Sequence, residues 1–324
     1  MARSLGAFAL IVALALMPGA GRGQPAMEPP AMEPPATDGP PAGVNPWRDY
    51  PTREVERPVL PPAKGMITSL DLRSVSASRA LDQDGNAKDT HGPFNLLTLM
   101  VQIAYGLTDR VELSAGFPYI TGEIGETEGG AIGSLFAAAR VGLLPAGGPA
   151  NIVAGLGASY PLGSADYHYE LLGKNLVLQN FRISDPSYDL YPELEGRYRV
   201  GAVSLRLSLT GIITNEGEVN FSNIYGDNKQ VTADPGDGYA AETGCYWQAT
   251  DHWVPGLFLR YTDVSETRID GKGLHDAMRR YELQPRIMWQ QSQSVEAMIG
   301  TGFVLAGKNT PLGYPVIIQI NARF

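Results

Sequence analysis

The side chains in this sequence that could do chemistry are mainly arginines and carboxylates, which recur at every second position of several segments. Arg280, Glu282 and Arg286, for example, alternate with apolar residues. Arginine has a planar fork of donors that suits carboxylates in a confined space. If these segments are strands, the charged residues share one face, because successive side chains of a strand point to opposite sides. The predicted inward set is Arg73, Arg140, Arg197, Arg206, Arg260, Arg280, Arg286 and Arg323, with Asp71, Glu112, Asp189, Glu193, Glu195, Glu242, Glu282 and Glu296.

Two interpretations of this inward set are open. In the first, the arginines and carboxylates form a structural network that braces the interior of a barrel. In the second, some of the arginines form a constriction that selects anionic or aromatic solutes. The balance of both signs argues against a strongly ion-selective pore. The residues expected to matter most are Arg140, Arg206, Arg260 and Arg286, facing Glu193, Glu242 and Glu282.

Histidines offer the other candidate chemistry. His168 lies near Asp166 and Ser164, and a second His–Asp pair occurs at 275–276. An enzymatic barrel needs a histidine within hydrogen-bond reach of a nucleophile or a carboxylate. Neither pair comes with a recognisable nucleophile motif, and adjacent residues on a strand point to opposite faces. We therefore predict no catalytic residues and no enzyme activity.

Metal, cofactor and nucleic-acid sites find little support in the sequence. Asp82, Asp84 and Asp89 could together hold a surface Ca²⁺, but solvated loop charges are the commoner explanation of such a cluster. The single cysteine, Cys245, excludes an internal disulfide and any Cys-rich metal or c-type haem site. We expect no metal and no cofactor. The formal net charge of -9 argues against a nucleic-acid partner.

The elements that would position these residues follow from a repeated pattern between Met66 and Phe324. About ten residues of alternating character and then a turn are the signature of a transmembrane strand, weak alone but strong when repeated. Short connections alternate with long polar ones, as in outer-membrane barrels. The pattern predicts an all-β fold, a transmembrane antiparallel up-and-down β-barrel of about twelve strands. The predicted strands are 66–78, 94–105, 111–121, 132–143, 151–161, 187–199, 202–213, 239–250, 254–263, 279–290, 295–305 and 314–324.

Aromatic residues fall near the two ends of these predicted strands, which agrees with the preference of rings for membrane–water interfaces. One predicted girdle, at the end with the short connections, contains Tyr105, Tyr198, Trp253, Trp289 and Phe324. The other, at the end with the long connections, contains Phe117, Tyr119, Tyr160, Tyr188, Tyr261, Tyr281 and Tyr314.

The N-terminal part of the chain differs in composition from the rest. Residues 1–23 are expected to be a cleaved signal peptide, because Arg3 precedes an apolar run and small residues follow that run. Residues 24–64 are rich in proline, which removes backbone donors and favours extended geometry. We expect a disordered periplasmic arm there, with the barrel over 65–324. Export and a barrel together predict the bacterial outer membrane as the location.

The last predicted strand carries a further signal. Val316, Ile318, Ile320 and Phe324 form its apolar face. This pattern resembles the terminal signal that the barrel-assembly machinery recognises in outer-membrane proteins. The expected partners are therefore that machinery, outer-membrane lipid and a small-molecule solute.

The hairpin over 105–113, with sequence YGLTDRVEL, continues to Phe117-Pro118-Tyr119 and has looser echoes at 247–256 and 289–296. It resembles a recurrent hairpin of an outer-membrane β-barrel transporter-like family associated with the meta-pathway of phenol degradation. The resemblance implies an outer-membrane channel and a hydrophobic or aromatic solute.

The function predicted from these observations is passive passage of small solutes across the outer membrane. A non-conducting structural or adhesive barrel is the alternative, and an outer-membrane hydrolase is a further one. The predicted long loop over 162–186 is unusually apolar. It could line a path for hydrophobic solutes, pack as a lid or extend the neighbouring strands.

Overall fold

The strands form a closed all-β barrel in a computed structural model that describes residues 45–124, 127–145, 147–162, 166–172, 175–180, 187–222 and 228–324. These residues belong to one unit, Asn45–Phe324. The wall has twelve antiparallel strands that pair in chain order, as predicted. The wall strands are β1 (Met66–Leu81), β2 (Ala87–Thr108), β3 (Val111–Ile124), β5 (Leu135–Gly142), β6 (Ala150–Tyr160), β9 (Asp189–Val200), β10 (Val203–Thr214), β13 (Gly238–Trp247), β14 (Trp253–Val264), β17 (Met278–Gln290), β18 (Val295–Thr301) with β19 (Phe303–Lys308), and β21 (Val316–Arg323).

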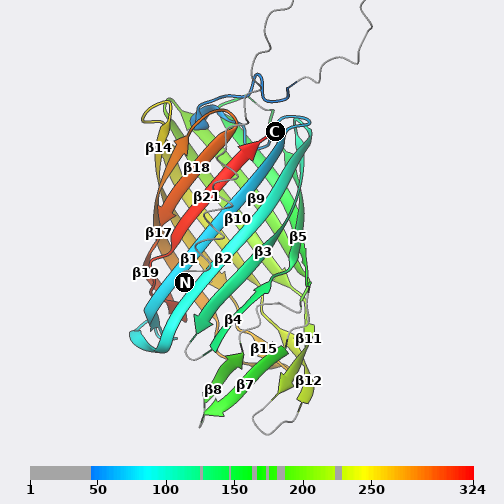
Figure 1. Ribbon diagram of the computed structural model, residues 1–324, viewed down its shortest axis with the longest axis vertical. Helices are drawn as coiled ribbons and strands as arrows, with labels where there is room; N and C mark the ends of the chain where they lie inside the picture. The colour runs from blue at the N-terminus through cyan, green and yellow to red at the C-terminus, as the bar shows by residue number, and fades with distance from the viewer. Residues whose placement is uncertain are drawn as a thin grey trace, which may run out of the picture. The chain divides into compact units, whose positions relative to one another are not determined.

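The barrel closes where its first and last strands meet. β1 and β21 pair antiparallel from Ile67 opposite Arg323 to Ser74 opposite Val316. Figure 1 shows the blue-cyan β1 and the red β21 side by side in the wall. Closure leaves no free edge along these residues, which a barrel requires because lipid offers no partners to backbone groups.

β18 and β19 together make one wall strand, interrupted at Gly302. β18 pairs with both β17 and β21, whereas β19 pairs with β17 alone. The sequence pattern predicted one unbroken strand over 295–305, so the interruption is a feature that alternation did not reveal.

The outer surface of the barrel is apolar. On β10, Leu205, Leu207 and Leu209 are exposed, and the residues between them face inward. Most rings of both predicted girdles are also exposed, including Tyr105 and Tyr198 at the end with the short connections. This arrangement is the reverse of a water-soluble protein and matches a lipid-facing band.

One side of the barrel interior is filled by apolar side chains. Tyr246 and Phe258 stack edge to face with centroids 4.8 Å apart. They form a buried cluster with Val254, Met288, Met298 and Ile317, which come from β14, β17, β18 and β21. Sequence alternation predicted these strands but not the filling of the lumen on one side.

The long connections form a second, smaller sheet. Its strands are β7 (Asp166–Leu172), β8 (Asn175–Asn180), β11 (Gly217–Ser222), β12 (Asn228–Asp234), β15 (Arg268–Ile269) and β16 (Lys272–Gly273). β7 and β11 pair in parallel, although they come from different connections. Two further short strands, β4 (Thr127–Ile132) and β20 (Thr310–Pro311), pair with β3 and β1.

The expectation of a disordered arm over 24–64 is wrong for residues 45–64. This part contains the 3-10 helix η1 (Glu54–Glu56), and Trp47, Val55 and Arg57 are buried. Proline does keep the segment out of the sheet, but its aromatic and charged side chains pack against the barrel. Residues 1–44, with the expected signal peptide and the rest of the arm, lie outside the described residues.

Candidate functional site

The residues 45–65, here called the N-terminal segment, are attached to the end of the barrel that carries the short connections, here called the short-turn end. Trp47 Nε1 donates a 2.6 Å hydrogen bond to the carbonyl oxygen of Phe324. The Lys64 amide donates to Gly106 O at 2.6 Å, and the Gly106 amide donates to Gly65 O at 2.9 Å. These bonds fix both ends of the segment to the wall.

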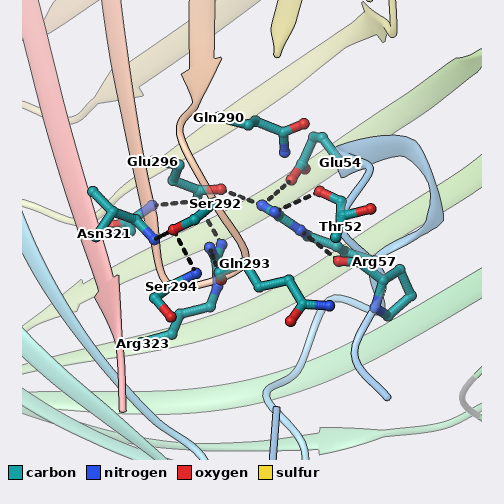
Figure 2. A network of polar contacts seen from close by, with 12 residues as sticks. Thr52, Glu54, Arg57, Gln290, Ser292, Gln293, Ser294, Glu296, Asn321 and Arg323 are labelled. Atoms are coloured by element: carbon teal, nitrogen blue, oxygen red, sulfur yellow. Dashed lines mark hydrogen bonds and ion pairs between the residues drawn. The ribbon is translucent and has the colours of Figure 1, made fainter. Parts of the chain in front are cut away.

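Arg57 is the centre of the contacts that hold this segment. Its side chain is 2% exposed and pairs with Glu54 at 3.4 Å and with Glu296 of β18. It also donates to the carbonyl oxygens of Pro51, at 3.1 Å, and Thr52, at 2.6 Å. Figure 2 shows this arginine between its two carboxylates. A buried charge needs such pairing to offset its desolvation.

Glu54 joins the segment to two further wall strands. It pairs with Arg206 of β10, and its carboxylate lies 3.7 Å from Arg197 of β9. Arg197 also donates to the Arg57 carbonyl oxygen and, at 2.8 Å, to Ser204 Oγ. The segment therefore bridges opposite parts of the short-turn end.

Glu296 is the second carboxylate shared between the segment and the wall. Besides Arg57, it binds Arg323 at 2.8 Å and accepts from Asn321 Nδ2 at 2.7 Å. Figure 2 shows these β21 side chains on the opposite side of Glu296 from Arg57. Two arginines and one amide thus satisfy a single buried carboxylate.

Tyr50 lies in the same packed region. Burial raises the pKa of Tyr50 to about 12, an effect that the Arg323 and Arg57 charges oppose and the Glu54 and Glu296 charges reinforce. The phenol therefore stays protonated and donates to the Pro58 carbonyl oxygen at 3.3 Å.

The described residues line two neighbouring cavities of the lumen. The one beside the N-terminal segment has a volume of 300 Å³, and Tyr50, Glu54 and Arg57 form part of its lining. The other has a volume of 420 Å³ and is lined by Met100, Gln102, Ser114, Phe136, Ala138, Arg140, Glu193 and Glu195. Gln102, Arg140 and Glu195 line both cavities, so the two meet at Arg140.

The wall around Arg140 is rich in carboxylates. Arg140 lies 3.4 Å from Glu112, 3.3 Å from Glu193 and in contact with Glu195. One guanidinium therefore holds three carboxylates from β3 and β9 together. This group gives the junction of the two cavities a negative balance.

The opposite wall is rich in arginine. Arg286 pairs with Glu242 through two hydrogen bonds of 3.0 and 2.6 Å and lies over the Phe258 ring. Glu282 is buried and lies 3.3 Å from both Arg73 and Arg280. These pairs connect β1, β13 and β17 through the interior.

Arg260 differs from its neighbours. It lies on β14 in register between Glu242 of β13 and Glu282 of β17. Those carboxylates bind other arginines, and across the described ranges Arg260 has no hydrogen bond or ion pair. Arg260 is thus a cation of the lumen whose neighbouring carboxylates are already paired with other arginines.

The structure places every arginine and carboxylate of the predicted inward set inside the barrel, but they do not form one network. Arg140, with Glu193, belongs to the carboxylate-rich wall; Arg73, Arg280 and Arg286 belong to the other wall with Glu242 and Glu282. Arg197 and Arg206 bind the N-terminal segment instead. The sequence alone did not identify their partners Glu54 and Arg57. The high proline content of this stretch indicated disorder, although its Trp, Tyr, Glu and Arg residues are able to pack against the barrel.

The candidate histidine sites gain no support from the described residues. Ser164 and the side chain of His168 lie outside them. His275 Nδ1 lies 3.6 Å from Glu266 on the surface. Asp82 accepts from the amides of Asp84 and Asn86 and so stabilises a turn. Within the described part of the chain, no group of three or more His, Cys, Asp or Glu residues could hold a metal ion.

The fold defines a class of protein: closed, antiparallel transmembrane β-barrels of twelve strands. The COG4313 outer membrane channel from Pseudomonas putida F1 is similar, with a TM-score of 0.64, 14% identity and coverage of 81% of this chain and 96% of that one. The β domain of the Bordetella autotransporter BrkA has a TM-score of 0.46 and 12% identity, with coverage of 81% and 100%. The KdgM porin has a TM-score of 0.44 and 10% identity, with coverage of 79% and 99%.

The similarity to the first of these structures supports the barrel fold, whereas the two weaker similarities are too low to support a conclusion. No protein-family model and no curated protein matches the sequence. The comparisons do not confirm the association with phenol degradation, which stays a prediction. In the described part of the chain, no helix is long and apolar enough to cross a membrane.

Proposed function

We propose that this protein is an outer-membrane channel for the passive passage of small solutes. The observation that carries the proposal is the pair of cavities, of 420 and 300 Å³, that meet at Arg140 inside a closed barrel. A non-conducting structural barrel could fill its lumen completely with side chains, as narrow barrels do. Here the buried apolar cluster occupies one side, and the two cavities lie beside it.

The lining of the cavities favours small solutes with both apolar and polar parts. Met100 and Phe136 offer apolar contact, while Arg140 and Glu193 lie in the same cavity. Carboxylates dominate one wall and arginines the other, which disfavours strong selection for either sign of ion. The proposed solutes are hydrophobic or aromatic molecules, a class that rests on the family resemblance.

The N-terminal segment restricts this passage at the short-turn end. Its residues Glu54 and Arg57 form ion pairs with three wall strands, so they are held firmly in the channel mouth. A solute must pass beside the segment or displace it. The same contacts favour the alternative, a non-conducting barrel braced across its end.

The location and assembly of the protein belong to the same proposal. The exposed apolar band would face outer-membrane lipid, and Val316 and Phe324 are exposed. Ile318 and Ile320 alternate with the inward-facing Ile317 and Gln319 on β21. We assign this strand as the signal for the barrel-assembly machinery.

The test is swelling of liposomes that contain the refolded protein, in neutral solutes of increasing size. A channel gives swelling rates that fall as the solute becomes larger. A folded barrel that gives no swelling with any solute would contradict the proposal and favour the bracing function. Folding is checked by the shift in gel mobility between heated and unheated samples.

A further inference from the structure

Two arginines of the wall lie side by side without a wall carboxylate between them. Arg197 of β9 and Arg206 of β10 are directly opposite in register, and both point into the barrel. Like charges at opposite positions of an antiparallel pair are destabilising unless a counter-charge is present. Among the described residues, the only carboxylate that pairs with either arginine is Glu54 of the N-terminal segment. The wall thus carries a site for an anion, and the segment supplies the anion.

The contacts of Glu54 show how a carboxylate occupies this site. Its Oε1 atom binds Arg206 Nη2 and lies 3.7 Å from Arg197 Nη1, so one oxygen is shared between two guanidinium groups. Its other oxygen lies 3.4 Å from Arg57 Nη1. Arginine forks bind carboxylates in this way whether or not the carboxylate belongs to the chain.

Both arginines keep unused donors when Glu54 is bound. Arg197 is buried and donates to Ser204 Oγ at 2.8 Å and to the Arg57 carbonyl oxygen. Its Nη2, like the Nε of Arg206, is buried and has no hydrogen bond among the described residues. A buried donor without an acceptor has lost its hydration without compensation. Glu54 offers the two arginines one oxygen, whereas a free carboxylate would offer two.

The site opens onto a cavity that a solute can reach. Arg197 and Arg206 both line the 300 Å³ cavity, which meets the larger one at Arg140. The side chain of Arg206 is 27% exposed although Glu54 lies against it. Its guanidinium carbon lies 5.0 Å from the centre of the Tyr246 ring, which also lines the cavity. A carboxylate that carries an aromatic ring would pack this ring against Tyr246 while it binds the arginines.

The other wall group that binds the segment does not depend on it. Glu296 pairs with Arg57 of the segment, but it also binds Arg323 of the wall at 2.8 Å. If the segment moves away, Glu296 keeps this wall partner. Arg197 and Arg206, by contrast, keep no ion pair among the described residues. A solute anion would then offset the charge of the arginine pair, because a buried charge needs a partner.

We propose that Arg197 and Arg206 form a binding site for the carboxylate of an aromatic acid, and that Glu54 occupies this site as a tethered competitor. The solute carboxylate takes the place of Glu54 and loosens the N-terminal segment, so the solute itself widens the short-turn end. The exchange replaces one carboxylate by another and leaves the charge of the site unchanged. Binding requires only the folded barrel, whereas the use of the site in transport rests on the proposed channel function.

The first test measures the binding of benzoate to the refolded protein by calorimetry, with benzamide as the uncharged comparison. Glu54→Gln should bind benzoate at least about tenfold more tightly than the unmodified protein, because the competing charge is gone. Glu56→Gln is the matched control, since Glu56 lies in the same 3-10 helix but forms a solvent-exposed pair with Arg53. This control should bind like the unmodified protein. Arg206→Gln should abolish binding, and benzamide should not bind.

The second test follows the segment itself. Saturating benzoate should speed proteolytic cleavage within 45–65 of the unmodified protein, because it displaces Glu54 from the arginines. Benzamide at the same concentration should leave the rate unchanged. Cleavage that does not respond to bound benzoate would show that the anion and the segment do not compete, and would overturn the proposal.

The binding results can also overturn it. Equal affinity of Glu54→Gln and Glu56→Gln would mean that Glu54 is not a competitor. Benzoate binding that survives Arg206→Gln in a folded barrel would place the anion elsewhere. If Arg206→Gln does not fold, the comparison of Glu54→Gln with Glu56→Gln decides alone.

Failure of the site and failure of the channel are distinguishable. Liposome swelling in neutral solutes, together with no binding of benzoate to any variant, would reject the site and retain the channel. Benzoate binding with the expected rank of variants, but no swelling, would retain the site and reject the channel.

Discussion

At the scale of single residues, Arg57 shows how a buried charge can hold a segment in place. It pairs with Glu54 of the N-terminal segment and with Glu296 of the wall strand β18. Removing it would leave both carboxylates buried with fewer partners. The loss of one member of a buried pair generally costs more than the intact pair contributes, because the remaining charge stays desolvated.

We predict that Arg57→Ala weakens docking of the N-terminal segment by about 3–5 kcal/mol. The measurement is the rate of proteolytic cleavage within 45–65 in the folded barrel. Arg53→Ala is the matched control, since the Arg53–Glu56 pair is solvent-exposed. Such exposed pairs contribute about 0–1 kcal/mol. Equal cleavage of the two variants would contradict the role given to Arg57.

Arg260 has the opposite character, because its neighbouring carboxylates bind other arginines. We predict that Arg260→Gln lowers anion permeability relative to cations and leaves thermal stability unchanged. The comparison variant is Arg286→Gln, which breaks the hydrogen bonds to Glu242 and should destabilise the barrel. Reversal potentials in a salt gradient and thermal unfolding measure the two effects. If the Arg260→Gln variant is stable and its ion selectivity is unaltered, Arg260 does not contact permeating anions.

Tyr50 provides a prediction of pH dependence. Burial raises its pKa from 10.0 to about 12, so the docked segment binds the protonated phenol. Its contribution to docking is complete below pH 10 and is lost as pH rises towards 12. The difference in tyrosinate absorbance between the unmodified protein and Tyr50→Phe isolates this titration. A midpoint near 10 would show that Tyr50 is not buried in the folded protein.

At the scale of elements, the wall strands were predictable and the N-terminal segment was not. Alternation locates strands because one face meets lipid and the other meets the lumen, as on β10 from Val203 to Thr214. Proline content indicates that a stretch cannot join a sheet, but it does not exclude packing by side chains. Trp47 and Arg57 bind the wall through their side chains and not through backbone pairing with a strand. The periodicity of the sequence therefore could not indicate these contacts.

The interruption at Gly302 could have been suspected from the sequence. Gly302, Pro311 and Pro315 are unusual for a continuous hairpin in a barrel wall. The pairing partners of Arg197 and Arg206 could not have been predicted. They depend on the position of Glu54, which lies 152 residues from Arg206 in the chain.

Gly106 allows the element-scale contact between the N-terminal segment and β2. An added Cβ there would collide with the Pro62 carbonyl oxygen. We predict that Gly106→Val displaces residues 60–65 and speeds proteolysis of the N-terminal segment while the barrel stays folded. Gly148→Val is the control, because the atoms nearest to its added Cβ are at least 3.6 Å away. Unchanged proteolysis of Gly106→Val would show that this contact does not hold the segment.

At the scale of the whole molecule, the composition hides the architecture. Mean hydropathy is -0.12, as in many water-soluble proteins, because an apolar outer face is averaged with a charged lumen. The interior resembles a protein surface and the exterior resembles a protein core. Balanced charges line the lumen, an apolar cluster fills one side, and a folded segment restricts the short-turn end. This combination is what a narrow channel for small solutes requires.

We propose that the lumen conducts and that the N-terminal segment restricts it. Single-channel recording of the refolded protein in planar bilayers, beside Arg57→Ala, tests both parts at once. We expect small discrete steps for the unmodified protein and larger ones for the variant. Silence from both, with folded barrels in each sample, would contradict the channel function. Steps of equal size would contradict the restriction.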